Sequence, residues 1–111
     1  MIADDLIWST RLADAVERAG GMPVRLGATA ALPVEPCDGV IVDLALRTTD
    51  GLAVIARWHT AGVPVLALAN HDDVDLRKRA MAAGAAKVLA YRKLFEDGPA
   101  AIAAWLGATV P

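Results

Sequence analysis

The sequence predicts a single α/β domain with a five-stranded parallel sheet and helices on both of its faces. Three short apolar runs rich in β-branched residues are typical of strands buried on both sides: residues 39–43, 63–68 and 86–91. Segments of helical period separate these runs, and strands that alternate with helices form parallel sheets. The 111 residues are enough for one core, so we expect one domain spanning residues 1–111.

Two further strands are expected near the start of the chain. Residues 23–26 form a polar run that contains Arg25, which is typical of an edge strand. Residues 1–4 form a very short fifth strand. Right-handed crossovers and the common order 2-1-3-4-5 then place the functional crevice outside the carboxyl ends of the first and third strands.

Four segments carry apolar residues at helical spacing: residues 7–19, 51–60, 73–83 and 97–106. Glycines follow the first three, and Asp97, with Pro99 in the first turn, is a suitable start for the fourth. Residues 27–37 should hold the helix between the second and third strands, but Pro33 and Pro36 allow one turn at most. We therefore expect this second helix to be shortened or missing.

Composition and charge argue against several classes of protein. Uncharged runs such as residues 62–70 are far shorter than the roughly 20 apolar residues of a membrane span, and no signal peptide is evident, so we expect a cytoplasmic protein. The single cysteine, Cys37, cannot form an internal disulfide. A net charge of −2 lacks the basic footprint of a nucleic-acid binder. No nucleotide-binding glycine motif or activated nucleophile is present, so we expect no independent enzyme.

Three aspartates end the strands that border the expected crevice. Asp4 and Asp5 end the first strand and Asp43 ends the third, so the predicted topology brings three carboxylates to one edge of the sheet. Carboxylates, water and phosphate oxygens are the ligands that Mg²⁺ prefers. We expect a weakly bound magnesium ion here, weakly because a very short first strand positions Asp4 and Asp5 loosely.

The segment that begins at Asp43 resembles the phosphoacceptor segment of response-regulator receiver domains of two-component signalling. In that family an aspartate ends the third strand, and a glycine eight residues later opens the third helix, as Asp43 and Gly51 do here. The resemblance extends to the acidic pair that ends the first strand, to residues 63–66 and to residues 80–85. It implies a flavodoxin-like fold, Asp43 as the phosphoacceptor, and Ala45 as a further contributor to the metal site.

Two positions depart from the family's pattern. Receiver domains carry a Ser or Thr at the end of the fourth strand and a Lys at the end of the fifth, whereas this sequence has Ala69 and Tyr91. Hydrogen bonds to charged groups contribute about 1.5–3 kcal/mol each, so losing two removes roughly the 5.5 kcal/mol that switches a two-state equilibrium. Asn70 is a candidate substitute for the hydroxyl, and Arg92 or Lys93 for the lysine.

The resemblance and its departures together indicate a stand-alone, degenerate receiver, a pseudo-receiver. We expect it to act mainly by protein binding, with a weak or absent phosphorylation response at Asp43. Its partner would be a histidine kinase or a downstream effector, and the resemblance implies partner contacts and a possible homodimer through residues 73–83, 86–91 and 97–106. Two alternatives stay open: a functional single-domain phosphoacceptor that relays phosphate from a histidine kinase, and a small-molecule-binding α/β domain.

Overall fold

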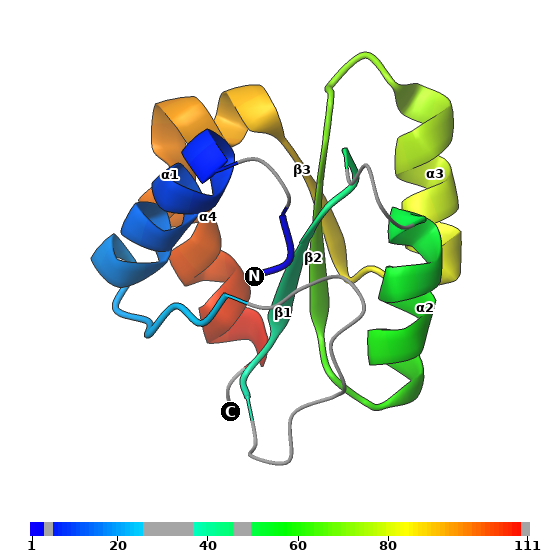
Figure 1. Cartoon of the computed structure of the whole chain (residues 1–111), viewed down its shortest axis with the longest axis horizontal. Coiled ribbons are helices and arrows are strands. Elements are labelled where there is room, and N and C mark those ends of the chain that lie inside the picture. The colour runs from blue at the N-terminus through cyan, green and yellow to red at the C-terminus, as the bar shows by residue number, and fades with distance from the viewer. Residues whose placement is uncertain (4–5, 26–36, 46–49, 110–111) are drawn as a thin grey trace.

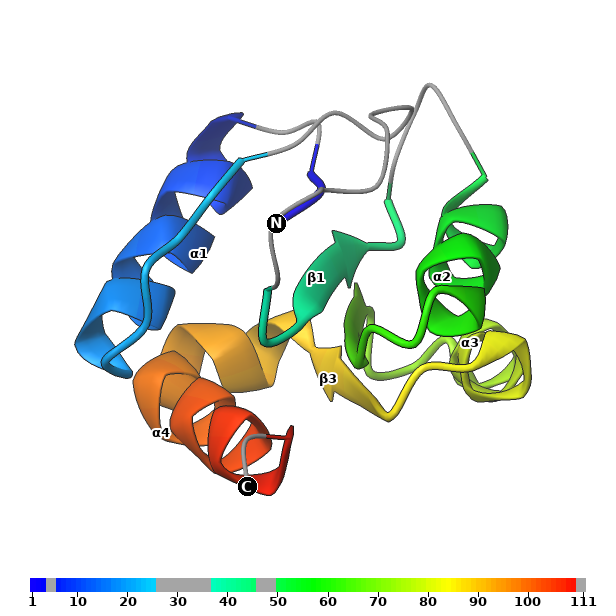
Figure 2. The same cartoon turned by 90° about the horizontal axis from the view of Figure 1, so that it is seen from below.

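A computed structural model describes residues 1–3, 6–25, 37–45 and 50–109, which form an α/β fold (Figure 1). In chain order the elements are α1 (Leu6–Arg18), β1 (Val40–Asp43), α2 (Gly51–Thr60), β2 (Val65–Ala69), α3 (Val74–Ala83), β3 (Lys87–Ala90) and α4 (Tyr91–Thr109). The three strands are parallel and hydrogen-bonded in the order β1-β2-β3. Helices α1 and α4 cover one face of this sheet, and α2 and α3 cover the other (Figure 2).

The expected five-stranded sheet was only partly right, because the described residues form three strands. Ile2 makes one parallel bridge with Val42, and the amino terminus of Met1 donates to the carbonyl of Val24 at 2.9 Å. These contacts lie in the expected spatial order, beyond the free edge of β1. Residues 23–25 form no strand, since Pro23 has no N–H to donate to a ladder. The predicted shortening of the second helix falls on residues 27–36, which lie outside the described ranges.

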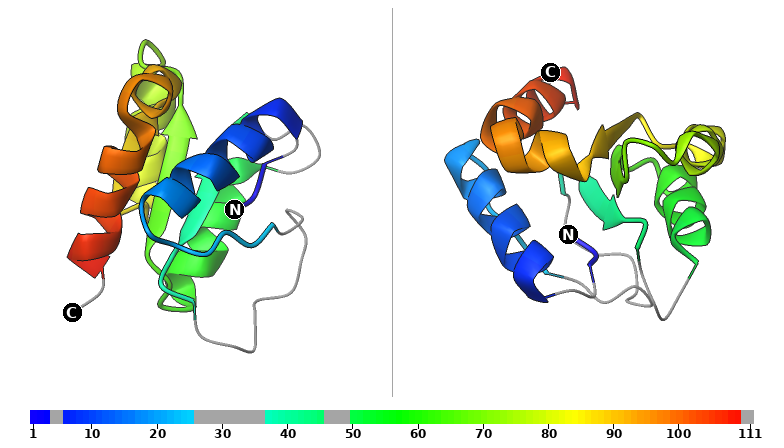
Figure 3. Two further views of the ribbon diagram at one scale, coloured as in Figure 1. Left: turned by 90° about the vertical axis from the view of Figure 1, so that its left-hand side faces the viewer. Right: turned by 90° about the horizontal axis from the view of Figure 1, so that it is seen from above.

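Alternate residues of the strands enter two separate apolar clusters, one on each face of the sheet. Val40 and Val42 of β1 pack with α2 and α3, whereas Ile41 packs with α1 and α4. Trp58 of α2 is fully buried in the first cluster, and Trp105 of α4 is 5% exposed in the second. The side views in Figure 3 show α1 and α4 lying together against the sheet. This alternation follows from the two-residue period of a strand, and it fixes which residues can reach the sheet's carboxyl edge.

The third strand and the last helix differ from the sequence prediction. Strand β3 lies at the sheet edge with Lys87 exposed, so it is not buried on both faces as expected. It ends at Ala90, and Tyr91 opens α4 rather than closing the strand. Asp97 has non-helical dihedral angles (φ −152°, ψ 36°), so α4 consists of two helical segments joined at a kink. The predicted start at Asp97 is therefore the start of the second segment only.

Helix α2 begins at the predicted residue and α3 one residue later than predicted, and each has an aspartate cap. The Asp50 carboxylate accepts the Leu52 N–H at 3.0 Å, and the Asp73 carboxylate accepts the Leu76 N–H at 3.1 Å. Gly84, with φ of +119°, ends α3 in the left-handed region. Among the helices described, none is both long and apolar enough to cross a membrane.

Candidate functional site at the carboxyl edge of the sheet

The carboxyl ends of the three strands bring the predicted site positions together. Asp43, the last residue of β1, lies opposite Leu68, so Ala69 at the end of β2 is one residue further along the same edge. Ala69 in turn lies opposite Ala90, directly before Tyr91. The parallel register therefore places Asp43, Ala69 and Tyr91 at one edge, as the topology predicted.

The Asp43 side chain is held at this edge by two hydrogen-bond donors. Its Oδ1 accepts the backbone N–H of Ala45 at 3.0 Å, and the same oxygen accepts the hydroxyl of Tyr91. Its backbone N–H donates to the carbonyl of Ile2 at 2.9 Å, which ties the end of β1 to the first residues of the chain. Asp43 is only 3% exposed. A carboxylate this deeply buried is stable only with partners, and these donors supply them.

Tyr91, at the position where the resemblance implies a lysine, is a neutral donor that contacts the Asp43 carboxylate. The ring is half-buried at the start of α4. Burial, followed by the hydrogen bond to Asp43 and the charge of that carboxylate, raises the pKa of Tyr91 above its ordinary value of 10.0. The hydroxyl therefore keeps its proton at neutral pH and donates a hydrogen bond to Asp43. Sequence reasoning singled out Tyr91 as a departure from the family pattern but missed this contact.

The two candidate substitutes for the family's lysine pair with carboxylates of α4 in this structure. Arg92 Nε donates to Glu96 Oε1 at 2.9 Å, and Lys93 Nζ to Asp97 Oδ2 at 3.2 Å, all on the exposed side of α4. These are contacts between residues four apart on one helix, which form once the segment after Tyr91 is helical. Asn70 follows β2 and is exposed.

The predicted magnesium site is described only in part. Asp4 and Asp5 lie outside the described residues, so their place relative to Asp43 is not given. Within the described ranges, no three His, Cys, Asp or Glu side chains gather closely enough to hold a metal ion. Asp43 and Ala45 are adjacent at the edge, but they supply one carboxylate, and its Oδ1 already accepts two hydrogen bonds. Magnesium at Asp4, Asp5, Asp43 and Ala45 therefore stays a prediction.

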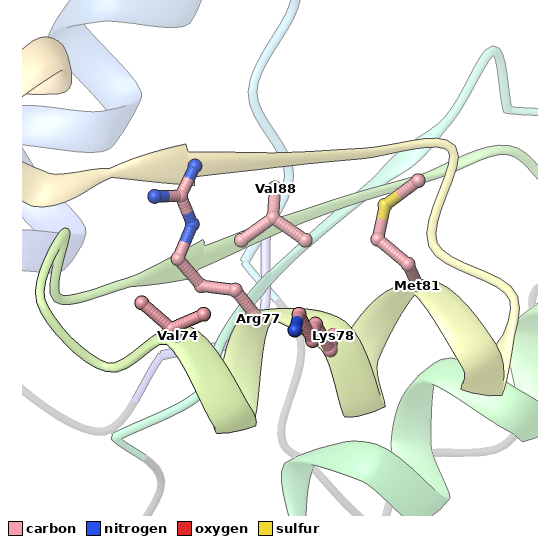
Figure 4. A pocket seen from close by; sticks show the side chains of 5 residues that line it. All are labelled: Val74, Arg77, Lys78, Met81 and Val88. Atoms are coloured by element: carbon pink, nitrogen blue, oxygen red, sulfur yellow. The ribbon is translucent and has the colours of Figure 1, made fainter.

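A groove lies beside this edge, between α3 and β3. It has a volume of about 290 Å³, and Figure 4 shows the side chains that line it: Val74, Arg77, Lys78, Met81 and Val88. Val74 and Met81 are 56% and 50% exposed, which is high for large apolar side chains. The sequence analysis missed these two residues, although their spacing of seven places them on one side of a helix.

Comparison with known proteins finds a sequence match over half of the chain. No protein-family model matches this chain. A segment of 58 residues, 50% of the chain, is 41% identical to the transcriptional regulatory protein QseB of Haemophilus influenzae. The match covers 26% of that regulator, so most of the regulator has no counterpart in this comparison.

Solved structures similar to the chain include receiver domains and response regulators. The receiver domain of the Francisella response regulator 1452 has a TM-score of 0.73 at 13% identity and covers 97% of this chain and 94% of its own. The signal receiver domain of a histidine kinase from Syntrophus aciditrophicus has a TM-score of 0.77 at 18% identity, covering 98% and 86%. NtrX from Brucella abortus reaches 0.78 at 21% identity, covering 97% of this chain and 25% of that protein.

The class defined by this fold and site is the flavodoxin-like α/β domain with an aspartate at the carboxyl edge of a parallel sheet. Within that class, the chain has the fold of the response-regulator receiver domains of two-component systems. The predicted resemblance is thus confirmed. At sequence identities of 13–21%, these structures support the fold alone. The chemistry of the site follows from this chain's own residues.

Proposed function

We propose that this chain is a receiver-type signalling domain that acts mainly by binding another protein, with a weak or absent phosphorylation response at Asp43. The open groove between α3 and β3 carries this proposal. Val74 and Met81 offer an apolar surface to a partner, and Arg77 and Lys78 beside them favour a partner segment with acidic side chains. The partner would be a histidine kinase or a downstream effector.

A weak phosphorylation response is supported by the residues around Asp43. Ala69, 1% exposed at the end of β2, has no hydroxyl to bond a phosphoryl oxygen. The positive charges that follow β3, Arg92 and Lys93, are both engaged with carboxylates of α4. A phosphoryl group on Asp43 would therefore gain neither of the two contacts that stabilise it in the intact family.

A homodimer through the same region belongs to this proposal. Several alanines on the outer sides of α3 and α4 are exposed and would let a second helix approach closely: Ala82, Ala100, Ala103 and Ala104. Arg77 and Lys78 line the groove and supply a polar rim, whereas Arg79 pairs with Asp75 at 3.8 Å. A cytoplasmic protein that has no enzymatic activity and binds magnesium weakly completes the proposal.

The experiment that tests this proposal compares two exposed methionines. Met81 lies in the groove, and Met22 is 88% exposed before the strands begin, so Met22→Glu is a matched control for Met81→Glu. Binding to purified histidine kinases and response regulators encoded beside this gene would be measured by calorimetry, and self-association by sedimentation. Met81→Glu should weaken binding at least tenfold, about 1.4 kcal/mol, and Met22→Glu should not. Equal affinities for the two variants would show that the groove binds no partner.

The phosphoacceptor alternative is favoured by one observation, the position of Asp43 at the end of β1 with Gly51 opening α2. Incubation with acetyl phosphate and Mg²⁺, followed by intact-mass measurement, separates the two proposals. Rapid, near-complete phosphorylation that Asp43→Asn abolishes would establish a phosphate relay. A trace of modification, with intact partner binding, is the result expected here.

A further inference from the structure

We propose that Tyr91 is a built-in block on Asp43, whose hydroxyl occupies the carboxylate oxygen that a phosphoryl donor or a cation would otherwise contact. The inference rests on the proposed function, because it takes Asp43 as the phosphoacceptor position. The weak response would then have a second cause. Besides the missing hydroxyl and lysine, the Tyr91 side chain itself would hinder phosphorylation of Asp43. Replacing Tyr91 should therefore restore reactivity to Asp43.

One oxygen of the Asp43 carboxylate already has two hydrogen-bond partners. Oδ1 of Asp43 accepts both the Ala45 N–H and the Tyr91 hydroxyl, and the whole residue is 3% exposed. A carboxylate that attacks phosphorus must present an oxygen in line with the leaving group, with room for the donor beside it. The phenol of Tyr91 and the Ala45 N–H together use the lone pairs of Oδ1, and the phenol lies against the carboxylate at that oxygen.

The fold holds Tyr91 next to Asp43. Tyr91 comes directly after β3, whose Ala90 lies opposite Ala69 in the parallel register. Three residues later, Leu94 is 5% exposed in the cluster shared with α1, which anchors the first helical segment of α4. The strand on one side and this anchor on the other limit where the ring can go. The contact with Asp43 is therefore set by the fold around Tyr91.

The chemistry that the block prevents is a single group transfer. With acetyl phosphate as the donor, an oxygen of Asp43 forms a bond to phosphorus as the bond from phosphorus to the acetate oxygen breaks, and acetate leaves with that electron pair. The carboxylate gives up no proton in this step. A phenol hydrogen bond withdraws electron density from the attacking group, and removing that bond raises its reactivity.

Two Tyr91 variants, each with and without Asp43→Asn, and one control test the block. Tyr91→Phe removes only the hydroxyl, Tyr91→Lys supplies the family's ammonium group, and each would be combined with Asp43→Asn to show dependence on the acid. Phe95→Leu is the matched control, because Phe95 lies in the same segment of α4 but is 66% exposed. Each protein would be incubated with acetyl phosphate and Mg²⁺ and followed by intact mass over time.

We expect Tyr91→Phe and Tyr91→Lys to be phosphorylated at least tenfold faster than the wild type, and Phe95→Leu to match the wild type. Rates for both Tyr91 variants as low as the wild type's would overturn the block, while the proposed function would still stand if Met81→Glu weakened partner binding. Rapid phosphorylation of the wild type would overturn the block and, separately, the proposed weak response.

A spectroscopic measurement keeps the proposal testable if the Tyr91 variants fail to fold. The chain has one tyrosine, so 3-fluorotyrosine incorporated throughout reports Tyr91 alone in a fluorine NMR spectrum. Asp43→Asn should shift this resonance, because it replaces the charged acceptor of the phenol hydrogen bond. An unshifted resonance in folded Asp43→Asn would show that Tyr91 does not hold Asp43 in solution.

Discussion

Replacing Gly84 with alanine should destabilise the protein through two separate effects. Gly84 ends α3 with φ of +119°, a conformation that costs an L-residue roughly 1–2 kcal/mol. A methyl group on Gly84 would also lie 2.7 Å from the Cβ and 2.6 Å from the Cδ2 of His59 on α2. Because a Cβ atom cannot move without its helix, α2 and α3 must separate, and overpacking of this kind costs about 1–3 kcal/mol.

A second glycine isolates the steric part of that cost. Gly62 also has a positive φ, +81°, but a methyl group there would meet no atom within 4 Å. We expect Gly62→Ala to lower the free energy of unfolding by about 1 kcal/mol, and Gly84→Ala by about 2–5 kcal/mol. At about 4 °C per kcal/mol for a domain of this size, the Tm of Gly84→Ala should fall by roughly 8–20 °C.

Urea denaturation followed by circular dichroism would measure both free energies. Combining Gly84→Ala with His59→Ala should recover only part of the loss, since the new side chain at position 59 keeps its Cβ atom. Equal losses of unfolding free energy for Gly84→Ala and Gly62→Ala would refute the reasoning. The backbone conformation would then account for the whole cost, and the close approach of α2 to α3 would contribute nothing.

Three further predictions concern a helix cap and the Asp43 site. Asp73→Ala removes the cap of α3 and should lower the free energy of unfolding by about 1 kcal/mol, whereas Asp72→Ala should not; urea denaturation that gives equal values would contradict the cap. Because the pKa of Tyr91 is raised, the stability that its hydroxyl adds should be complete below pH 10.0 and decline above it. If the difference in unfolding free energy between wild type and Tyr91→Phe, measured in urea, is the same at neutral and at high pH, the contact is contradicted. Millimolar Mg²⁺ should shift the amide signals of Asp43 and Ala45 in NMR spectra, and saturation at micromolar Mg²⁺ would exclude the weak site expected here.

The elements with clear start and stop signals could be predicted from the sequence. The bounds of α2 agree with the prediction because Asp50 caps its first turn and Gly62 follows its end. The predicted start of α4 was wrong. Residues 91–96 contain neither a helix breaker nor a strong cap, and an apolar run that ends in Tyr91 is equally typical of a strand. Contacts between side chains four residues apart, such as Arg92 with Glu96, favour the helix over the strand. These contacts can be recognised only once the backbone conformation is known.

The candidate site was predictable in its layout but not in its contacts. Asp43 lies at the carboxyl edge because parallel strands all end there, a property of topology that sequence order reveals. The hydrogen bond from Tyr91 depends on where α4 turns away from β3, so the strand prediction concealed it. The groove was missed for a related reason: Val74 and Met81 interrupt the polar side of α3, and only the placement of β3 shows what lies across from them.

The break in α4 at Asp97 separates two mechanical roles within one helix. The second segment is fixed by Ile102 and Trp105, which are 0% and 5% exposed in the core shared with α1. Pro99 has no N–H, so it cannot complete the hydrogen bond that would couple the last turn of the first segment to the second. The six residues from Tyr91 to the break thus form a separate helical unit, attached to the core through Leu94 and the partly buried Tyr91. Moving Tyr91 away from Asp43 would therefore also move Leu94 out of the core shared with α1.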